Sequence, residues 1–210
     1  MKGKMSEIEK KKEEFEPFTF IEGDTVDLVA GRSEWAHLVC KWRNSPQVRR
    51  YSRNAMPRSL DAVKKRMESP PEGRVREHIM FFIWHKKDRK PIGNVGLNHI
   101  QWLNRTANAF LQIGEPDYWG KNIATETTKL LLQYAFEEVN LHSVTGKVAT
   151  NNVGSWRVAE KMGFIYEGTT KEEFYVDGVY EDVKCYRFLK QDWFKLKESE
   201  TKRDQNQGEI

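Results

Sequence analysis

The residues best suited to chemistry lie at 118–126, where the sequence reads YWGKNIATE. This run follows an apolar stretch at Ala109–Ile113 and opens a helical pattern that continues to about residue 139. The first N–H groups of a helix lack intrahelical acceptors, and the helix dipole adds partial positive charge at that end. A strand that leads through such a loop into a helix is therefore expected to bind a phosphate or pyrophosphate.

Each residue type in the loop suits that task. Gly120 lets the backbone approach a ligand closely, Asn122 tolerates a left-handed backbone, and Ala124 keeps the wall of the loop low. Thr125 adds a hydroxyl donor and Lys121 adds a positive charge. By itself the loop is weak evidence, because small-residue turns before helices are common.

A second motif follows at 151–164, NNVGSWRVAEKMGF. Together the two motifs resemble the GNAT superfamily, the Gcn5-related N-acetyltransferases. The first is similar to the family's pyrophosphate loop, Gln/Arg-x-x-Gly-x-Gly/Ala. The second is similar to the Asn-x-x-Ser…Glu-Lys-x-Gly-Phe segment of the subgroup that includes the Rim-type ribosomal-protein N-terminal acetyltransferases and the polyamine acetyltransferases. The resemblance spans roughly Phe20 to Trp193.

Two positions depart from the family's loop pattern. Trp119 stands where the pattern has Gln or Arg, and we expect it to pack the base of the loop rather than to touch phosphate. Asn122 stands where the pattern has its first Gly. Asn is the non-glycine residue best suited to a left-handed position, so Asn122 is expected to hold the turn.

The resemblance implies that acetyl-CoA is the cofactor and leaves coenzyme A as product. In this family the strand before the loop splays from the strand after the helix, and the pantetheine arm lies in the gap. Asn152 is then expected to reach that arm, although Asn is also among the best plain helix N-caps. Lys161 is expected to approach the 3′-phosphate. The implied cofactor-binding residues are Leu111, Gln112, Ile113, Trp119, Gly120, Lys121, Asn122, Ile123, Ala124, Thr125, Asn152, Ser155 and Lys161.

The proton donor that many GNAT enzymes use is missing. Its tyrosine would stand four residues before the Gly of Gly-Phe, and here that position is Ala159. Ser155 is the best substitute for protonating the departing thiolate, directly or through a water. A serine at a helix start that bonds locally is the competing interpretation.

The general base is the weakest assignment. Rim-type enzymes have a carboxylate facing the acceptor on the strand after Gly168, and the position matched to it here is Phe174. Glu172 lies two residues earlier on the same face of a regular strand and is the alternative, although an exposed strand charge is the more common interpretation. His99 is a further candidate, and Asp182 is expected to stabilise the last hairpin. An amine that loses its proton through ordered water needs none of them.

These motifs must be positioned by an α+β domain, a mixed and mainly antiparallel sheet with helices on both faces. Ser33 and Ser59 are predicted to cap two early helices, and Asp177-Gly178 is predicted to form a hairpin turn. Residues 1–16 and 196–210 are rich in alternating Lys and Glu. We expect a single domain at 17–195 between two flexible tails, each of them helical only if it docks on something. The expected strands are 18–21, 25–29, 79–84, 92–100, 107–113, 142–149, 164–175 and 179–189.

Composition excludes several function classes. The 210 residues carry a net charge of +4 with both signs interleaved, which does not favour nucleic-acid binding. The five histidines lack metal-ligand spacing, so no metal is expected. Cys40 and Cys185 are too far apart in sequence for a metal-spaced pair and suit a reducing compartment. A charged N-terminus without an apolar segment predicts no secretory signal, and no run is long enough to cross a bilayer.

We therefore expect a cytoplasmic acetyl-CoA-dependent N-acetyltransferase that transfers the acetyl group directly within a ternary complex. The acceptor amine is a protein N-terminus, a polyamine or a small molecule such as an amino sugar, and a homodimer is left open. We expect the acceptor pocket between the first helices, the linker at 49–54 and the last hairpin. The alternative is a non-catalytic acyl-CoA-binding or regulatory module, supported by Ala159 and Phe174. Nucleic-acid binding through Arg49, Arg50 and Arg53 is a third, weaker hypothesis.

Overall fold

The computed structural model describes residues 16–52, 56–68 and 75–207. The predicted tail at 1–16 lies almost wholly outside this range. The helices are α2 (Ala36–Asn44), α3 (Pro46–Arg49), α4 (Leu60–Met67), α5 (Ile123–Gln133, continued as a π-helical turn at Tyr134–Glu138), α6 (Val153–Met162) and α7 (Lys190–Gln207). The strands are β1 (Thr19–Ile21), β2 (Val26–Ala30), β3 (Ile79–His85), β4 (Lys90–Gln101), β5 (Thr106–Ile113), β6 (Ser143–Ala149), β7 (Ile165–Val176) and β8 (Val179–Leu189).

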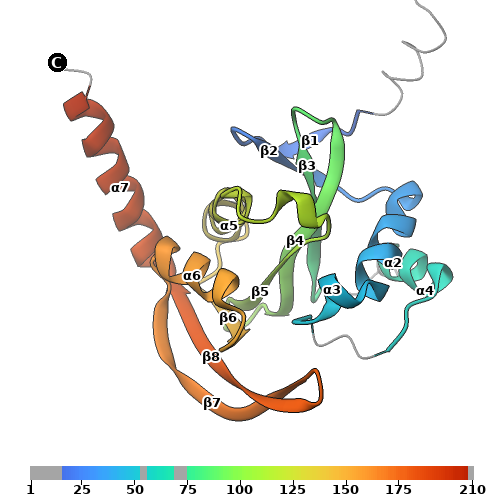
Figure 1. The fold of residues 1–210 in the computed structure, drawn as a ribbon. Coiled ribbons are helices and arrows are strands. Elements are labelled where there is room, and N and C mark those ends of the chain that lie inside the picture. The colour runs from blue at the N-terminus through green and yellow to red at the C-terminus, as the bar shows by residue number, and fades with distance from the viewer. Residues whose placement is uncertain (1–15, 53–55, 69–74, 208–210) are drawn as a thin grey trace, which may run out of the picture.

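The described strands form one eight-stranded sheet in the order β1-β2-β3-β4-β5-β6-β8-β7. The pairing of β5 with β6 is parallel, and the other neighbours are antiparallel. A parallel pair needs a crossover, and α5 supplies it. Figure 1 shows β7 and β8 as a long curved hairpin that extends below the other strands. The predicted fold class, a mainly antiparallel mixed sheet, is confirmed.

Helices cover the two faces of this sheet, and each face has its own core. On one face α5 buries Ile123, Leu130 and Leu131 against the apolar side chains of β2 to β6. On the other face α2 and α4 bury Trp42 and Val63 against β3. The phosphate-binding candidates and the first helices therefore approach the sheet from opposite sides.

Of the two predicted helix caps, one is confirmed and one is wrong. The Ser59 side chain accepts a hydrogen bond from the N–H of Ala62 at 3.2 Å, which confirms it as the cap of α4. The prediction for Ser33 is wrong, because Ser33 begins a 3-10 turn and α2 starts only at Ala36. The N–H of Trp35 bonds to the Arg32 carbonyl at 3.0 Å, so the chain enters α2 through this turn and no side chain caps it.

The C-terminal segment differs from the predicted flexible tail at 196–210. Helix α7 runs to Gln207, and Figure 1 shows it projecting from the end of β8. Two ion pairs tie this helix to the domain, Lys197 to Glu137 at 2.8 Å and Lys129 to Glu200 at 2.8 Å. Docking of this kind is the condition under which a charged segment becomes helical.

The loop after β5 is held by α2. The indole N–H of the fully buried Trp42 donates to Glu115 Oε1 at 2.8 Å, and the Lys41 ammonium lies 2.8 Å from the same oxygen. Burial opposes the ionisation of Glu115, but the hydrogen bonds from Lys41 and Trp42 outweigh it and lower the pKa of this carboxyl. The Trp42 ring lies directly over Gly114, where an added Cβ would be 2.1 Å from Cδ2 of the indole. Only glycine fits there.

We expect Gly114→Ala to destabilise the protein by about 2–3 kcal/mol, because the methyl group overpacks a site that cannot relax. Chemical unfolding with intrinsic tryptophan fluorescence measures this change. Gly146→Ala is the matched control, since a Cβ at Gly146 meets nothing within 4 Å. Equal denaturation midpoints for the two variants would show that Trp42 moves aside freely.

Candidate functional site

The loop that enters α5 has the backbone expected of an anion site. A short 3-10 turn at Pro116–Tyr118 leads into it, and Gly120 then adopts φ +74°. Asn122 is the N-cap residue of α5 with φ +62° and ψ 0°, a left-handed conformation. The prediction that Asn122 holds the turn is confirmed. A Cβ at Gly120 would meet nothing within 4 Å, so this side of the loop is open.

The loop presents a row of unused N–H groups. The N–H groups of Thr125 and Glu126 both bond to the carbonyl of Asn122, at 3.1 and 3.2 Å. Among the described residues, no acceptor within hydrogen-bonding distance is found for the N–H groups of Gly120–Ala124. The candidate cradle, defined as the free N–H groups of Gly120–Ala124, therefore lacks the N–H of Thr125 that the sequence suggested. Thr125 retains only its hydroxyl for a ligand. Free N–H groups at a helix N-terminus favour an anion.

Two lysines lie at this loop in different ways. The Lys161 ammonium, from the last turn of α6, donates to Asn122 Oδ1 at 2.8 Å. The structure therefore brings Lys161 to the loop, where its charge adds to that of the helix N-terminus. The Lys121 ammonium instead lies over the Tyr118 ring, 5.3 Å from its centroid. Trp119 ties the base of the loop, as predicted, because its indole N–H donates to the Ile113 carbonyl at 2.9 Å.

β5 and β6 diverge below the loop. They pair only at Thr106–Asn108 and Ser143–Thr145, although β5 continues to Ile113 and β6 to Ala149. Beyond the pairing, β6 stays bonded to β8 over its whole length. The two strand ends therefore leave an open seam, defined as the unpaired edges of 109–113 and 146–149, which ends at the loop.

The backbone N–H and C=O groups of successive residues in β5 point alternately toward β4 and toward this seam. The N–H of Gly114 donates to the Ile92 carbonyl at 2.8 Å, and Gly93 lies opposite Ile113. Because antiparallel pairs alternate, the backbone groups of Ile113 and Leu111 then point away from β4 and into the seam. Those of Gln112 point toward β4. Of the three residues predicted to bind the pantetheine arm through their backbone, only Leu111 and Ile113 therefore face the seam. The Ile113 carbonyl already accepts one hydrogen bond, from the Trp119 indole.

The first turn of α6 follows the open end of β6. Asn152 caps the helix, and its Oδ1 accepts from the backbone N–H of Ser155 at 3.4 Å. Ser155 is exposed, and among the described residues its hydroxyl has no bonding partner. The helix cap uses the backbone of Ser155 and leaves the hydroxyl for chemistry. A role of Asn152 at the pantetheine arm stays a prediction, since its amide N–H₂ remains available.

The hairpin of β7 and β8 contains an irregularity that sequence reasoning missed. The register shifts between Thr170 and Phe174, and Glu172 adopts φ +50° inside that bulge. The prediction that Glu172 shares a strand face with Phe174 is wrong, because the bulge breaks the alternation: Phe174 is buried and Glu172 is exposed. The catalytic role of Glu172 stays a prediction. Glu172 remains a candidate general base, because its side chain is exposed at a left-handed backbone position.

Asp182 holds this bulge, in line with its predicted architectural role. The Lys171 ammonium donates to Asp182 Oδ2 at 2.7 Å, and the N–H of Glu172 donates to Oδ1 at 3.0 Å. These two bonds lower the pKa of the Asp182 carboxyl. The other base candidate, His99, lies in a bulge between Asn98 and Gln101, at the end of β4 away from the open seam.

Glu160 has a partner that the sequence did not suggest. The buried Tyr186 hydroxyl on β8 donates to Glu160 Oε1 at 2.9 Å. Burial, reinforced by this hydrogen bond, raises the pKa of Tyr186. The contact fixes the orientation of α6 on the sheet and so positions both Ser155 and Lys161.

Within the described residues, no group of three or more His, Cys, Asp or Glu side chains has the arrangement of a metal site. None of the described helices is both long enough and apolar enough to span a bilayer.

Comparison with known proteins gives consistent results. The family model described as "Acetyltransferase (GNAT) domain" matches residues 29–165. A putative ribosomal N-acetyltransferase of Bacillus subtilis is 35% identical over 101 residues, which are 48% of this chain and 55% of that protein. A spermidine N(1)-acetyltransferase of Vibrio cholerae is 35% identical over 103 residues, 49% of this chain and 59% of that protein. The chain thus spans little more than half the length of these curated relatives.

Among solved structures, the spermidine N-acetyltransferase of Vibrio cholerae in complex with CoA and spermine superimposes with a TM-score of 0.75. The two chains are 25% identical, and the match covers 81% of this chain and 98% of that one. The likeness therefore extends over most of this chain.

Proposed function

Because this chain belongs to the acetyltransferase (GNAT) domain family, we propose that it moves an acetyl group from acetyl-CoA to a primary amine by direct transfer in a ternary complex. It is then a transferase of the acyltransferase class. The observation that carries the proposal is the cradle of free N–H groups at Gly120–Ala124, placed where the seam between β5 and β6 ends. Neither these N–H groups nor the edges of the seam have backbone partners among the described residues, so both are available to one extended ligand.

The residues at the loop and the seam fit acetyl-CoA. The N–H groups of Gly120–Ala124 suit the pyrophosphate, and the ammonium of Lys161 adds a positive charge beside them. The backbone groups of Leu111 and Ile113 suit the amides of the pantetheine arm, with Asn152 beyond them at the mouth of α6. When bound, acetyl-CoA supplies a thioester whose acetyl carbon is open to attack by an amine.

The protein's own part in the reaction is to move two protons. A C–N bond forms to the acetyl carbon, the C–S bond breaks, and the sulfur leaves with the electron pair. Ser155 donates a proton to that sulfur and is reprotonated from water, since its hydroxyl is exposed and without a partner among the described residues. The amine gives up its proton to Glu172 or to water.

The acceptor stays within the predicted set of a protein N-terminus, a polyamine or a small-molecule amine. The relatives include enzymes named for ribosomal and for spermidine acetylation, and they support amines as a class. A reducing, cytoplasmic location belongs to the same proposal and is supported by the free thiols of Cys40 and Cys185.

Thiol release from acetyl-CoA in the presence of a panel of amines tests this function. The panel holds peptides with free N-termini, spermidine and an amino sugar, and the products are identified by mass spectrometry. We expect amine-dependent release with at least one acceptor, at a rate above about 1 s⁻¹ with the natural one. Calorimetric binding of acetyl-CoA without release for any amine would favour the non-catalytic module instead.

A further inference from the structure

The first three helices form a strongly basic segment. Residues 36–67 contain nine Lys and Arg side chains and a single acidic one, Asp61, so this segment alone has a net charge of +8. The whole chain carries +4. The remaining residues are therefore net acidic, and the interleaving of charge that the composition suggested does not hold over α2, α3 and α4.

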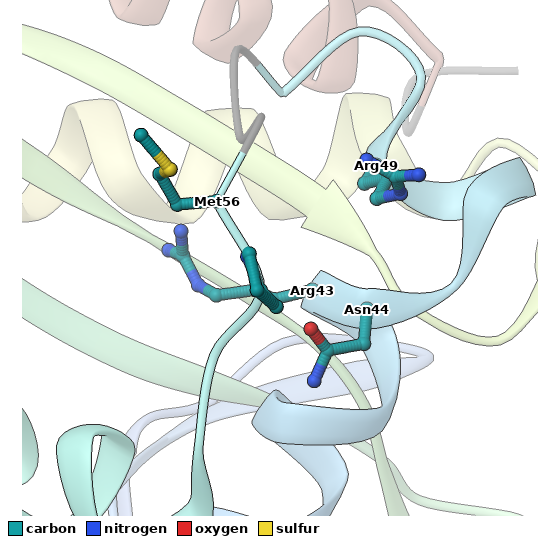
Figure 2. Close-up of a pocket in the computed structure, with 5 residues that line it drawn as sticks. Arg43, Asn44, Arg49 and Met56 are labelled. Carbon is teal, nitrogen blue, oxygen red and sulfur yellow. The ribbon is translucent and has the colours of Figure 1, made fainter.

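Two of these cations line one cavity. A cavity of about 180 Å³ is lined by Arg43 and Asn44 of α2, Arg49 of α3, and Met56 and Pro57 of the linker to α4. Figure 2 shows the guanidinium of Arg43 reaching toward Met56, with Arg49 carried on the neighbouring helix. Burial, followed by repulsion from Arg66 and Arg58, lowers the pKa of Arg43. An anion beside Arg43 would offset this repulsion.

The cavity lies on the acceptor side of the open seam. Directly after α3, Arg50 forms an ion pair of 2.6 Å with Asp177, in the turn between β7 and β8. The next residue, Tyr51, packs against a cluster that contains Ala149, the last residue of β6, together with Phe174. The segment that carries Arg49 therefore contacts the end of the seam on the side opposite to α5.

The hairpin that faces this segment offsets only part of its charge, because Asp177 pairs with Arg50 of the segment. Three further carboxylates of the hairpin pair with cations outside the segment, which are Lys147 for Glu173, Lys171 for Asp182 and Arg187 for Glu167. Glu181 accepts from the neutral amide of Asn151. Glu172 remains exposed. A cation such as a polyamine would thus enter past the positive charges of α2, α3 and α4, and an anion would be attracted.

We propose that the acceptor is a peptide N-terminus followed by acidic residues, whose carboxylates bind the basic segment while the amine reaches the seam. This inference rests on the proposed function. A peptide fits better than a small anionic amine, because α2, α3 and α4 each carry Lys or Arg among the described residues and one small anion needs only a few of these cations. The occupant of the cavity itself is a carboxylate side chain from that peptide.

Fluorescent peptides that differ only in charge test the inference by binding to the protein loaded with CoA, which requires no turnover. We compare the N-terminal sequences Ser-Glu-Glu and Ser-Lys-Lys on a common neutral tail. We expect the acidic peptide to bind at least about tenfold more tightly, with a preference that shrinks as salt is added. Acetylation of the same peptides should follow the same order.

Charge reversal locates the preference. In the double variant Arg49→Glu with Arg66→Glu we expect the preference for the acidic peptide to fall at least about tenfold, with unchanged affinity for acetyl-CoA. The matched control is the double variant Lys87→Glu with Lys202→Glu, which reverses the charge of two exposed lysines, one on the β3–β4 turn and one on α7. This control alters the net charge equally and should keep the preference.

The outcomes separate the inference from the proposed function. Equal binding of the two peptides, or tighter binding of the basic peptide or of spermidine, overturns the inference whether or not acetylation occurs. Competition by RNA together with no peptide preference also overturns it and assigns the basic segment to nucleic acid. A clear preference for the acidic peptide without any acetylation supports the inference about binding and contradicts the proposed enzyme.

Discussion

Replacing Gly120 by Val is expected to weaken the binding of acetyl-CoA at least tenfold, a loss of about 1.4 kcal/mol or more. The side that a Cβ would occupy is open, with nothing within 4 Å, so the isopropyl group would stand where the pyrophosphate must approach the N–H groups. Isothermal titration calorimetry on the folded variant measures the loss.

The control for this variant must account for backbone strain. Gly120 has φ +74°, so any side chain there is strained whether or not a ligand binds. Gly178 has φ +89° and equally open surroundings in the β7–β8 turn. Gly178→Val should therefore cost similar stability and leave the affinity for acetyl-CoA unchanged. If both variants lose affinity equally, strain rather than blocked access explains the result.

A second substitution tests the turn itself. Asn122→Gly keeps the left-handed conformation and removes only the contact with Lys161. It should retain most of the affinity that Asn122→Val loses, because a β-branched residue strongly disfavours positive φ. Unchanged affinity in all three loop variants would remove the pyrophosphate cradle from the proposal.

Ser155→Ala is expected to lower kcat by roughly 10- to 100-fold, toward the low end of general-acid effects because a water can partly substitute. The affinity for acetyl-CoA should change little, since the cradle is made by backbone groups. Initial rates, KM and melting temperature measured on the same protein give the comparison.

The structure makes this test cleaner than the sequence alone allows. The cap of α6 uses the backbone N–H of Ser155, which alanine retains, so the melting temperature should hardly change. Asn152→Ala is the matched variant that loses the cap and costs about 1 kcal/mol. Ser155→Thr keeps a hydroxyl and should recover part of the activity. Full turnover in Ser155→Ala would contradict the role of Ser155 as the acid and would show that solvent protonates the leaving sulfur.

Local signals in the sequence determined the position of the candidate site. Asn122 at a left-handed position and Asn152 as a cap each act within one turn of backbone, so residue type alone predicts them. The Asp177-Gly178 turn is confirmed for the same reason, because both residues adopt the positive φ that a tight hairpin requires. These features fix where the loop, the helix starts and the hairpin lie along the chain.

Tertiary structure alone decided how these parts meet. Lys161 reaches Asn122 across 39 positions, and Trp42 reaches Glu115 across 73, distances over which no local pattern carries information. The bulge at Glu172 and the direction of the Gln112 backbone depend on strand register, which is set by the packing of the neighbouring strand. The basic segment at 36–67 is visible in the sequence, but only folding places it beside the seam. Residue types thus determined the chemistry on offer, and long-range packing decided which groups face the same space.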